Sequence, residues 1–422
     1  MSVGGSASDL ETRLLNEVAQ SYAWRDPVPP MVGVMVSGGG DSMALLHLMH
    51  RAGRLRGWRV EAITVDHGLR AEAAGEAAMV AQVCAGLGIA HQISVWDHGD
   101  ITGNLMNQAR RARYKLVAEW AHQRGIADVV LGHTADDQAE TFLMGLARKS
   151  GLDGLSGMRV AWPEHEIGWL RPLLSVTRAD LRQYLRTQGL AWVEDPSNDD
   201  EGFARVKARR VLQALRPLGI TAATLAGVSD NLAMARGAIG WQLARTSQMV
   251  TQTAAGSLSF SRDQYLALPM EIQRRLLIAA LRWTSGVEYP PRESGLMAVQ
   301  WAIAVQKDAT LGGVRFKTKA DAIHILREAK AVQSLGCPTT QLWDNRWQLT
   351  GPHGANLSIR ALGSDGLSLC KDWRATGHPR DALLVTPAIW QGQTLIAAPL
   401  AGFSNDWCAN CGPSFASFVL SH

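Results

Sequence analysis

The chain has 422 residues, of which 46% are hydrophobic and 19% are charged, a composition typical of a folded globular protein rather than a disordered one. Its formal net charge of +4 permits a polyanionic partner without demanding one, and its five cysteines provide no disulfide framework. With roughly 100–200 residues in a typical domain, this length predicts two or three domains.

At the start of the chain, Asp9, Glu11 and Glu17 stand where a secretory signal would need an apolar core. No stretch of the sequence reaches the ~20 apolar residues that a membrane helix requires. The sequence therefore predicts a cytoplasmic protein with no membrane partner.

The first two hundred residues alternate short apolar runs with segments of helical spacing. Strands are expected at Met31–Val36, Val60–Asp66, Gln92–Trp96 and Asp128–Gly132. Helices are expected at Ser42–Leu55, Glu72–Leu87, Asn107–Arg124 and Asp136–Arg148. This alternation predicts an α/β fold, with a parallel sheet flanked by helices on both faces. Ligands of such sheets bind beyond the carboxyl ends of the strands, which are followed here by Ser37–Ser42, Asp66–Arg70 and His133–Asp137.

Beyond the sheet the pattern changes twice. A helix is expected at Thr177–Thr187, with Thr177 as its cap, and a basic stretch follows at 203–216. Residues 220–305 have helical spacing, and short strands are expected within 310–326 and 341–361. We therefore expect three domains, an α/β domain at 1–216, a helical domain at 217–310 and a small β-rich domain at 311–422.

The first strand runs directly into the loop Ser37-Gly38-Gly39-Gly40-Asp41-Ser42 and then into a helix. Glycines let the backbone turn sharply and come close to a ligand, while the free N–H groups of a helix start carry partial positive charge. The two serine hydroxyls can add hydrogen bonds. The loop therefore predicts a phosphate-binding site, in preference to a plain strand–helix turn in which Asp41 or Ser42 acts as a cap.

This loop differs from two common nucleotide-binding loops. The sequence contains neither Gly-x-x-x-x-Gly-Lys-Ser/Thr nor Gly-x-Gly-x-x-Gly. The loop instead resembles the Ser-Gly-Gly-x-Asp-Ser loop of the PP-loop ATP pyrophosphatases. The resemblance implies that ATP is cleaved between its α- and β-phosphates and that the departing pyrophosphate is held by Ser37, Gly38, Gly39, Gly40, Asp41 and Ser42. It also implies Mg²⁺ at the phosphates, with Asp41 as a candidate ligand.

A second polar group follows the fourth strand and consists of His133, Asp136, Asp137 and Glu140. Carboxylates at a helix start can serve only as caps, because negative charge is favourable there. A cap needs one carboxylate, however, and two adjacent ones beside a phosphate loop suit metal or ammonium binding better. We therefore predict that these four residues and Asp41 are catalytic, and that Asp137 shares the metal with Asp41.

Five segments, in this order and spacing, resemble the signature of the tRNA(Ile)-lysidine synthetase family. They are Val65–Arg70, Ala109–Tyr114, Gly132–Thr141, Arg171–Leu173 and Glu194–Asn198. The resemblance covers about residues 30–215, and the remainder is similar to the longer form of the family only in layout. It implies ATP-dependent ligation of free lysine to C2 of the wobble cytidine in the CAU anticodon of tRNA(Ile), through an adenylated cytidine.

The same resemblance implies roles for other residues. Asp66 and His67 join the nucleotide-binding residues, and Arg113 joins the catalytic ones. Contact with tRNA is implied for Arg70, Arg110, Arg171, Arg205 and Arg209, although a charged helix face is usually only solvated surface. The two later domains are also expected to contact tRNA. Four positions depart from the family pattern, namely Met106, Lys149, Val206 and Ala208.

Three alternative functions remain. A tRNA cytidine thiolase would need cysteines near the nucleotide, and the α/β region has only Cys84, in a helix that we expect to bury it. A small-molecule adenylating ligase would leave the C-terminal half without a purpose, and a non-catalytic RNA-binding protein would not need the intact loop.

The CxxC of Cys408 and Cys411 suggests a redox or metal pair, but a zinc site usually needs a second ligand pair. Oligomeric state is left open, a homodimer included, and Trp343–Trp347 is expected to pack.

Overall fold

The computed structural model describes residues 7–22, 29–68, 72–97, 105–194, 204–287 and 289–421. Their contacts divide the chain into two compact units, Met1–Arg236 and Gly237–His422. The division falls within helix α9 (Ala222–Val250). The predicted boundaries at 216/217 and 310/311 stay a prediction.

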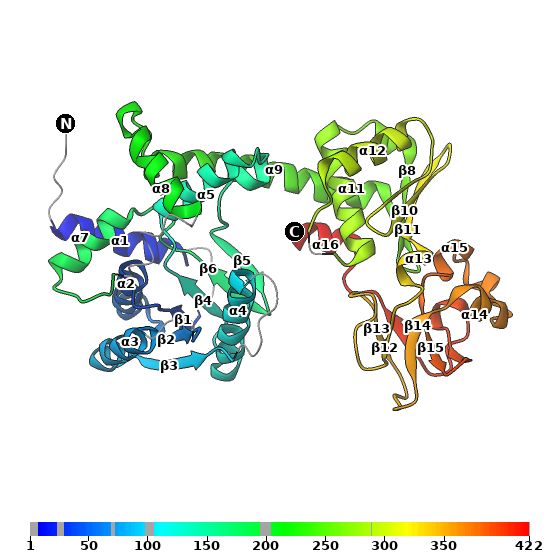
Figure 1. Cartoon of the computed structure of the whole chain (residues 1–422), viewed down its shortest axis with the longest axis horizontal. Helices are drawn as coiled ribbons and strands as arrows, with labels where there is room; N and C mark the ends of the chain where they lie inside the picture. The colour runs from blue at the N-terminus through cyan, green and yellow to red at the C-terminus, as the bar shows by residue number, and fades with distance from the viewer. Residues whose placement is uncertain are drawn as a thin grey trace. The chain divides into compact units, whose positions relative to one another are not determined.

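A six-stranded sheet forms the centre of the first unit (Figure 1). Its strands lie in the order β3 (Ala90–Val95), β2 (Arg59–Asp66), β1 (Met31–Met35), β4 (Asp128–Leu131), β6 (Ile167–Leu170) and β5 (Ala161–Glu164). All neighbouring strands are parallel except β5 and β6. The predicted α/β fold is therefore confirmed, and the four predicted strands are β1 to β4. The β5–β6 hairpin was not predicted, because its turn consists of His165 and Glu166, which have positive φ without being typical turn residues.

Helices cover this sheet on both faces. The helices of residues 1–216 are, in chain order, α1 (Ala7–Gln20), α2 (Gly40–Arg56), α3 (Ala73–Leu87), α4 (Leu105–Arg124), α5 (Ala135–Ala147), α6 (Leu152–Leu155), α7 (Arg178–Thr187) and α8 (Ala204–Leu215). The helices expected between residues 42 and 187 are all present, with ends within two residues of those predicted. Thr177 caps α7 as expected, because its hydroxyl accepts a hydrogen bond from the backbone nitrogen of Asp180 at 3.2 Å.

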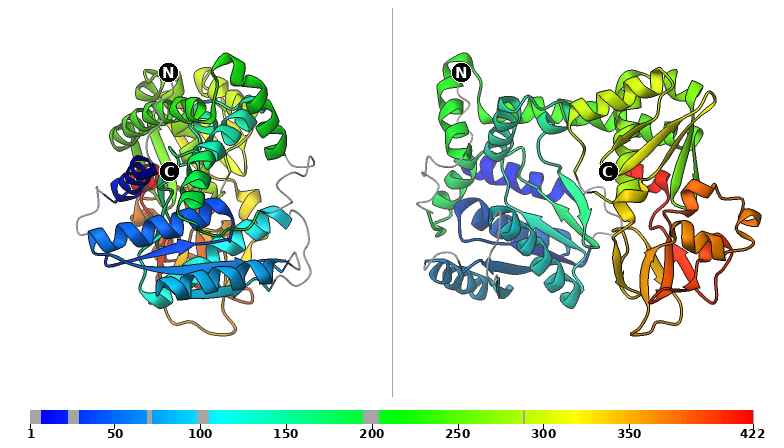
Figure 2. Two further views of the ribbon diagram at one scale, coloured as in Figure 1. Left: turned by 90° about the vertical axis from the view of Figure 1, so that its left-hand side faces the viewer. Right: turned by 45° about the vertical axis from the view of Figure 1, so that its right-hand side comes forward.

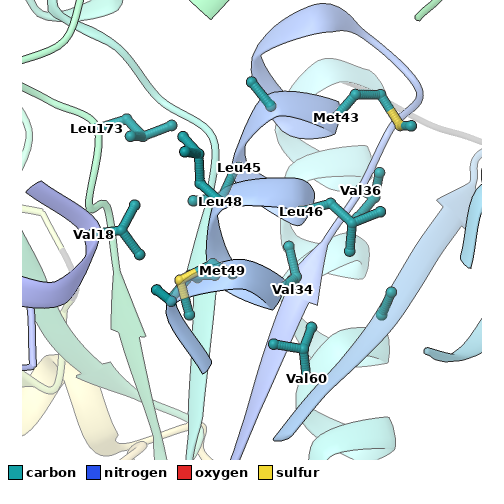
Figure 3. Close-up of a cluster of buried hydrophobic side chains, with 14 of the residues drawn as sticks. Val18, Val34, Val36, Met43, Leu45, Leu46, Leu48, Met49, Val60 and Leu173 are labelled. Carbon is teal, nitrogen blue, oxygen red and sulfur yellow. The ribbon is translucent and has the colours of Figure 1, made fainter. Parts of the chain in front are cut away.

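Strand β1 has a separate core on each face. Val32, Val34 and Val36 are buried on the face covered by α1, α2, α3 and α7, where Figure 3 shows Val34 and Val36 among side chains of α2. On the other face lies α4, and Gly33 leaves room for its Trp120 ring, which comes within 2.9 Å of the place where a Cβ would stand. Burial on both faces explains the continuous apolar run in the sequence.

The second unit contains three antiparallel sheets, seen from another side in Figure 2. The first has the order β7 (Thr251–Ala254), β8 (Ser257–Ser261), β11 (Ala322–Arg327), β10 (Val314–Thr318) and β9 (Ala309–Leu311). The second has the order β12 (Gly336–Pro338), β14 (Ser358–Ala361), β15 (Pro387–Gln391) and β16 (Thr394–Ala397), and the third pairs β13 (Gln348–Thr350) with β17 (Cys408–Asn410). The C-terminal part is therefore rich in strands, as expected.

Helices surround these sheets in the second unit. Two of them, α11 (Met270–Ser285) and α12 (Glu293–Ala304), share a core with the buried face of β10, to which Val314 and Phe316 contribute. The shorter helices are α10 (Arg262–Leu266), α13 (Ala329–Val332), α14 (Gly363–Leu369), α15 (Arg380–Leu383) and α16 (Phe415–Ser421).

The expectation of helical structure over residues 220–305 is wrong at the β7–β8 hairpin. The two strands are joined by Ala255 and Gly256, both with positive φ, in a two-residue turn. Strand β8 also pairs with β11, so residues on either side of position 310 share one sheet. The hairpin was missed because its strands are short and its turn lacks the usual Asn-Gly or Asp-Gly.

The burial of side chains confirms two further expectations, one about tryptophans and one about a cysteine. Trp343 and Trp347 are 1% and 2% exposed, so they pack, as expected. All five cysteines are free, and Cys84 is fully buried in α3, as predicted. Among the described residues, no single helix is both long and apolar enough to cross a membrane; by length and composition alone, only the bent pair Ala204–Leu218 with Ala222–Gln248 reaches that threshold.

Candidate active site

The glycine-rich loop 37–42 links the end of β1 to the start of α2. Gly39 is the N-cap residue of α2, and no side chain of the described residues caps this helix. Ser42 instead donates its hydroxyl to the carbonyl of Gly39 at 2.9 Å and accepts a hydrogen bond from the backbone nitrogen of Ser37 at 3.1 Å. The plain capped turn is therefore not what the loop forms. An uncapped helix start favours an anionic ligand.

Two glycines fit the loop to its surroundings. Gly38 has a φ of +85°, a left-handed conformation that other residues rarely adopt. A Cβ added to Gly132, just after β4, would lie 3.0 Å from the carbonyl oxygen of Asp41 and from the Cα of Ser42. The chain therefore passes directly beside the loop after β4, which brings the start of α5 close to residues 37–42.

Asp137 is bound on both of its oxygens. Its Oδ2 accepts hydrogen bonds from the backbone nitrogen and the hydroxyl of Thr134, the N-cap residue of α5, at 2.9 and 2.8 Å. Its Oδ1 accepts one from Nη2 of Arg178 at 2.5 Å. Burial opposes the charged form, but Arg178 and the bonds from Thr134 outweigh it and hold the pKa of Asp137 below its usual value. Asp137 is thus both a helix cap and an ionised member of the site.

Arg178, the first residue of α7, joins the glycine-rich loop 37–42 to the carboxylates of α5, and sequence reasoning did not single it out. Besides the bond to Asp137, its Nε donates to Oδ2 of Asp41 at 3.1 Å and its Nη1 to Oε1 of Glu140 at 2.7 Å. Its backbone nitrogen donates to Oδ2 of Asp136 at 2.8 Å. The sequence did indicate that a basic residue was missing from the predicted site, because carboxylates gathered at two neighbouring strand ends need a cation among them.

Glu140 has no exposed surface, and its Oε1 accepts a second hydrogen bond from Nε of Arg209 at 2.7 Å. Its Oε2 is buried and accepts no hydrogen bond from the residues that the structure describes. Four carboxylates, those of Asp41, Asp136, Asp137 and Glu140, thus bond with two arginines. Carboxylates gathered in this way can also hold a cationic ligand, either an ammonium group or a divalent metal.

Asp41 differs from Asp137 in its ionisation. Its side chain is 26% exposed, and burial raises its pKa from 3.8 to about 6 against the lowering effect of Arg178. The charge of Asp137 raises the pKa of Asp41 further. The Asp41 carboxylate is therefore incompletely neutralised by the protein itself.

Two histidines near the strand ends are each paired with an arginine. Nε of Arg113 donates to Nε2 of His67, and Nε of Arg171 donates to Nδ1 of His133, both at 3.1 Å. Burial, reinforced by these arginines, lowers the pKa of His67 to about 4 and that of His133 to about 3. Both rings are therefore neutral near pH 7, and because Nδ1 of His133 accepts the hydrogen bond from Arg171, its proton lies on Nε2, which can donate a hydrogen bond.

These lowered pKa values predict that acid destabilises the protein at His67 and His133. Between about pH 4 and 6.5, His67 is protonated in the unfolded chain but stays neutral in the folded protein. The free energy of unfolding therefore decreases as pH falls through this window. The raised pKa of Asp41 acts in the opposite direction, so the histidine effect must be isolated by comparison. We expect the melting temperature of His67→Gln to fall less than that of the unmutated protein between pH 7 and 4.5, measured by circular dichroism. If the melting temperatures of the two proteins fall equally between pH 7 and 4.5, the lowered pKa of His67 is not a cause of the acid destabilisation.

The predicted tRNA-contacting arginines lie in different surroundings. Arg110 is exposed and lies 5.1 Å from the centre of the Tyr114 ring, and Arg205 is exposed on α8. Arg171 is only 5% exposed and stacks on Trp162 at 3.9 Å. Arg209 is half-buried against Glu140, and Arg70 lies outside the described residues. The tRNA contacts therefore stay predictions, with Arg110 and Arg205 the most accessible.

The four departures from the expected pattern have local explanations in three cases. Lys149 has a φ of +55° just after α5, the conformation for which glycine is favoured. Val206 and Ala208 are 8% and 6% exposed, so they pack α8 against the protein. Met106 is 65% exposed in the first turn of α4, and nothing in the structure explains it.

The chain was compared with protein-family models, with known proteins and with solved structures. A family model of the PP-loop domain matches residues 10–215. The chain is 44% identical over 397 residues to the tRNA(Ile)-lysidine synthase of Ruegeria pomeroyi, covering 93% of this chain and 95% of that protein. It is 34% identical over 369 residues to the tRNA(Ile)-lysidine synthase of Wolbachia pipientis wMel, covering 84% of each. Among solved structures it is similar to the U34-tRNA thiolase NcsA from Methanococcus maripaludis, with a TM-score of 0.47 and 16% identity over 54% of this chain and 79% of that chain.

Proposed function

Because the chain belongs to the tRNA(Ile)-lysidine synthase family, we propose that it is an ATP-dependent ligase that joins lysine to the wobble cytidine of a tRNA(Ile) with a CAU anticodon. The observation that carries this proposal is the uncapped start of α2 at the glycine-rich loop, beside the carboxylates of Asp41 and Glu140 that Arg178 holds together. The loop suits the pyrophosphate of ATP, and the carboxylates suit the ammonium group of lysine.

The reaction has two steps. In the first, the C2 oxygen of cytosine attacks the α-phosphorus of ATP, the bond to the β-phosphate oxygen breaks, and pyrophosphate leaves into the loop formed by residues 37–42. In the second, the ε-amine of lysine attacks C2, and AMP leaves with the C2 oxygen. The amine must lose protons to become neutral and form the new bond, and Glu140, whose buried Oε2 accepts no hydrogen bond from a described residue, is the proposed acceptor. His133 donates its Nε2 hydrogen to oxygen atoms of the substrates.

Mg²⁺ is the proposed metal, because it is commonly held by one or two carboxylates together with nucleotide phosphates. No group of three or more His, Cys, Asp or Glu side chains within the described ranges forms a metal site by itself. Asp41 fits such a shared site, since burial raises its pKa and only its Oδ2 is bonded by a described residue. Asp137, with both oxygens bonded, is the proposed second ligand. Bound there, Mg²⁺ would offset the charge of the phosphates.

The remaining partners follow from the same proposal. Asp66 and His67, at the end of β2, are proposed to contact the nucleotide, and Arg113 orients His67. The exposed Arg110 and Arg205 are proposed to contact tRNA together with Arg70, Arg171 and Arg209. Residues 217–422 are proposed to extend that contact, and the enzyme is expected to act in the cytoplasm, as a monomer or a homodimer.

A tRNA thiolase is the less favoured alternative. Cys84 is the only cysteine in residues 1–236, and it is fully buried. Burial also raises the pKa of its thiol to about 11, so it is not a reactive thiolate. No sulfur relay is therefore evident among the described residues of the first unit.

The test uses purified protein, ATP, Mg²⁺, labelled lysine and tRNA(Ile) transcript with a CAU anticodon. Covalent label on the wobble cytidine that requires ATP, and that Asp41→Ala lowers by at least ~100-fold, is the expected result. Asp41→Ala is compared with Glu119→Gln, an exposed change on α4 that should leave transfer intact. Conversion of ATP to AMP and pyrophosphate without lysine transfer would reject lysine as the substrate and leave the adenylation step standing.

A further inference from the structure

Arg178 makes contacts that no other described residue of the site matches. Each of the three nitrogens of its guanidinium group bonds to a different carboxylate, on Asp41, Asp137 and Glu140. Its side chain is 19% exposed, and the three carboxylates are 26%, 8% and 0% exposed. Mutual repulsion among carboxylates so poorly solvated would separate them if this cation were removed.

The backbone of Arg178 is itself held in place. The carbonyl of Val176, two residues earlier, accepts a hydrogen bond from the backbone nitrogen of Ala135 at 2.8 Å, which ties the start of α7 to the start of α5. Thr177 caps α7, and Leu181, Tyr184 and Leu185 are buried in the core that α7 shares with α2. The guanidinium group therefore projects from a rigid support rather than from a loop.

We propose that Arg178 is a positioning residue, which fixes Asp41 of the phosphate loop relative to Asp137 and Glu140 of α5. The proposal rests on the function proposed above, because Asp41 belongs to the adenylation step and Glu140 to the lysine step. A planar guanidinium group presents its N–H donors in a fixed fork, so it sets the spacing of three carboxylates at once. A lysine ammonium group is a point charge on a flexible stem and sets at most part of that spacing.

The positioning role makes a prediction that simple stabilisation does not. If Arg178 acts on adenylation through Asp41, its loss must matter little once Asp41 has lost its charge. Two residues that act through one another give a double variant no worse than the more severe single variant, whereas independent residues give effects that multiply.

The experiment measures pyrophosphate release with tRNA, ATP and Mg²⁺ in the absence of lysine. We expect Arg178→Gln to slow release at saturating ATP by about 100-fold, the cost typical of displacing a reacting group by about 1 Å, with the KM for tRNA unchanged. Arg178→Lys keeps the charge and is expected to recover about tenfold. Asp41→Asn combined with Arg178→Gln should be no slower than Asp41→Asn alone.

Arg182→Gln is the matched control, because Arg182 lies one turn further along α7 and its side chain is 45% exposed, 3.8 Å from Glu194. It should release pyrophosphate at the unmutated rate. A double variant slowed by the product of the two single effects would overturn the proposal, as would an Arg178→Lys enzyme no faster than Arg178→Gln. If Arg178→Gln does not fold, the Arg178→Lys enzyme with and without Asp41→Asn makes the same comparison. Because lysine is absent, failure of lysine as a substrate does not affect this result.

Discussion

Asp41→Asn is expected to slow pyrophosphate release by about 100–1,000-fold and, at pH 8, to raise the melting temperature of the ligand-free protein. The two effects have one cause. Asp41 is a carboxylate that burial disfavours in its charged form, with a pKa raised from 3.8 to about 6. The negative charge of the Asp41 carboxylate destabilises the ligand-free folded protein, and the same charge would be needed to bind a metal–phosphate complex.

The direction of the stability change follows from proton binding. Between pH 3.8 and about 6 the folded protein holds a proton on Asp41 that the unfolded chain has released, so stability falls as pH rises through this window. Above it the full cost remains, at most about 3 kcal/mol for a shift of about two pKa units. Asparagine removes that cost, and each kcal/mol gained should raise the melting temperature by roughly 2–4 °C.

Melting curves at pH 8 and pH 4 test this prediction. The gain of Asp41→Asn over the unmutated protein should be present at pH 8 and nearly absent at pH 4, where both side chains are neutral. Glu119→Gln, which removes an exposed charge 3.8 Å from Lys115, should change the melting temperature little at either pH. If Asp41→Asn lowers the melting temperature equally at both pH values, the charge of Asp41 does not destabilise the folded protein.

The parts of this site that sequence alone predicted are those encoded locally. The buried strand β1 followed by glycines and serines marks the phosphate loop, because each feature lies within a dozen consecutive residues. The same is true of the group from His133 to Glu140, which directly follows β4. In both cases the chemistry adjoins the strand end that carries it, so the topology of a parallel sheet is enough to bring the two groups together.

Arg178 was missed for the opposite reason. It lies 137 residues from Asp41 in the chain, and nothing in its own neighbourhood distinguishes it from other arginines near a helix start. The pairing of Arg113 with His67 and of Arg171 with His133 is likewise a tertiary contact, which the sequence alone did not predict. What the sequence did contain was a group of carboxylates expected at one sheet edge, to which no arginine or lysine side chain had been assigned as a partner.

Glu140→Gln is expected to lower the stability of the folded protein by about 2–4 kcal/mol and to slow the transfer of lysine to pre-adenylated tRNA by at least ~100-fold. Glu140 has no exposed surface and accepts hydrogen bonds from both Arg178 and Arg209. Glutamine can keep one acceptor oxygen, but it leaves two guanidinium groups without that counter-charge. It also puts an NH₂ donor at the position of Oε2, where no described residue bonds.

Replacing Arg209, the other arginine bonded to Glu140, tests whether the lost charge causes the loss of stability in Glu140→Gln. When one member of a buried ion pair is removed, most of the cost comes from the charge that remains, so removing Arg209 as well should restore part of the stability. We therefore expect Glu140→Gln with Arg209→Gln to resist urea better than Glu140→Gln alone, while lysine transfer stays slow because the proposed proton acceptor is still missing. If the double variant unfolds at a lower urea concentration than the single variant, the loss comes from packing around Glu140. If lysine transfer recovers with stability, Glu140 supports the fold and does not take the proton.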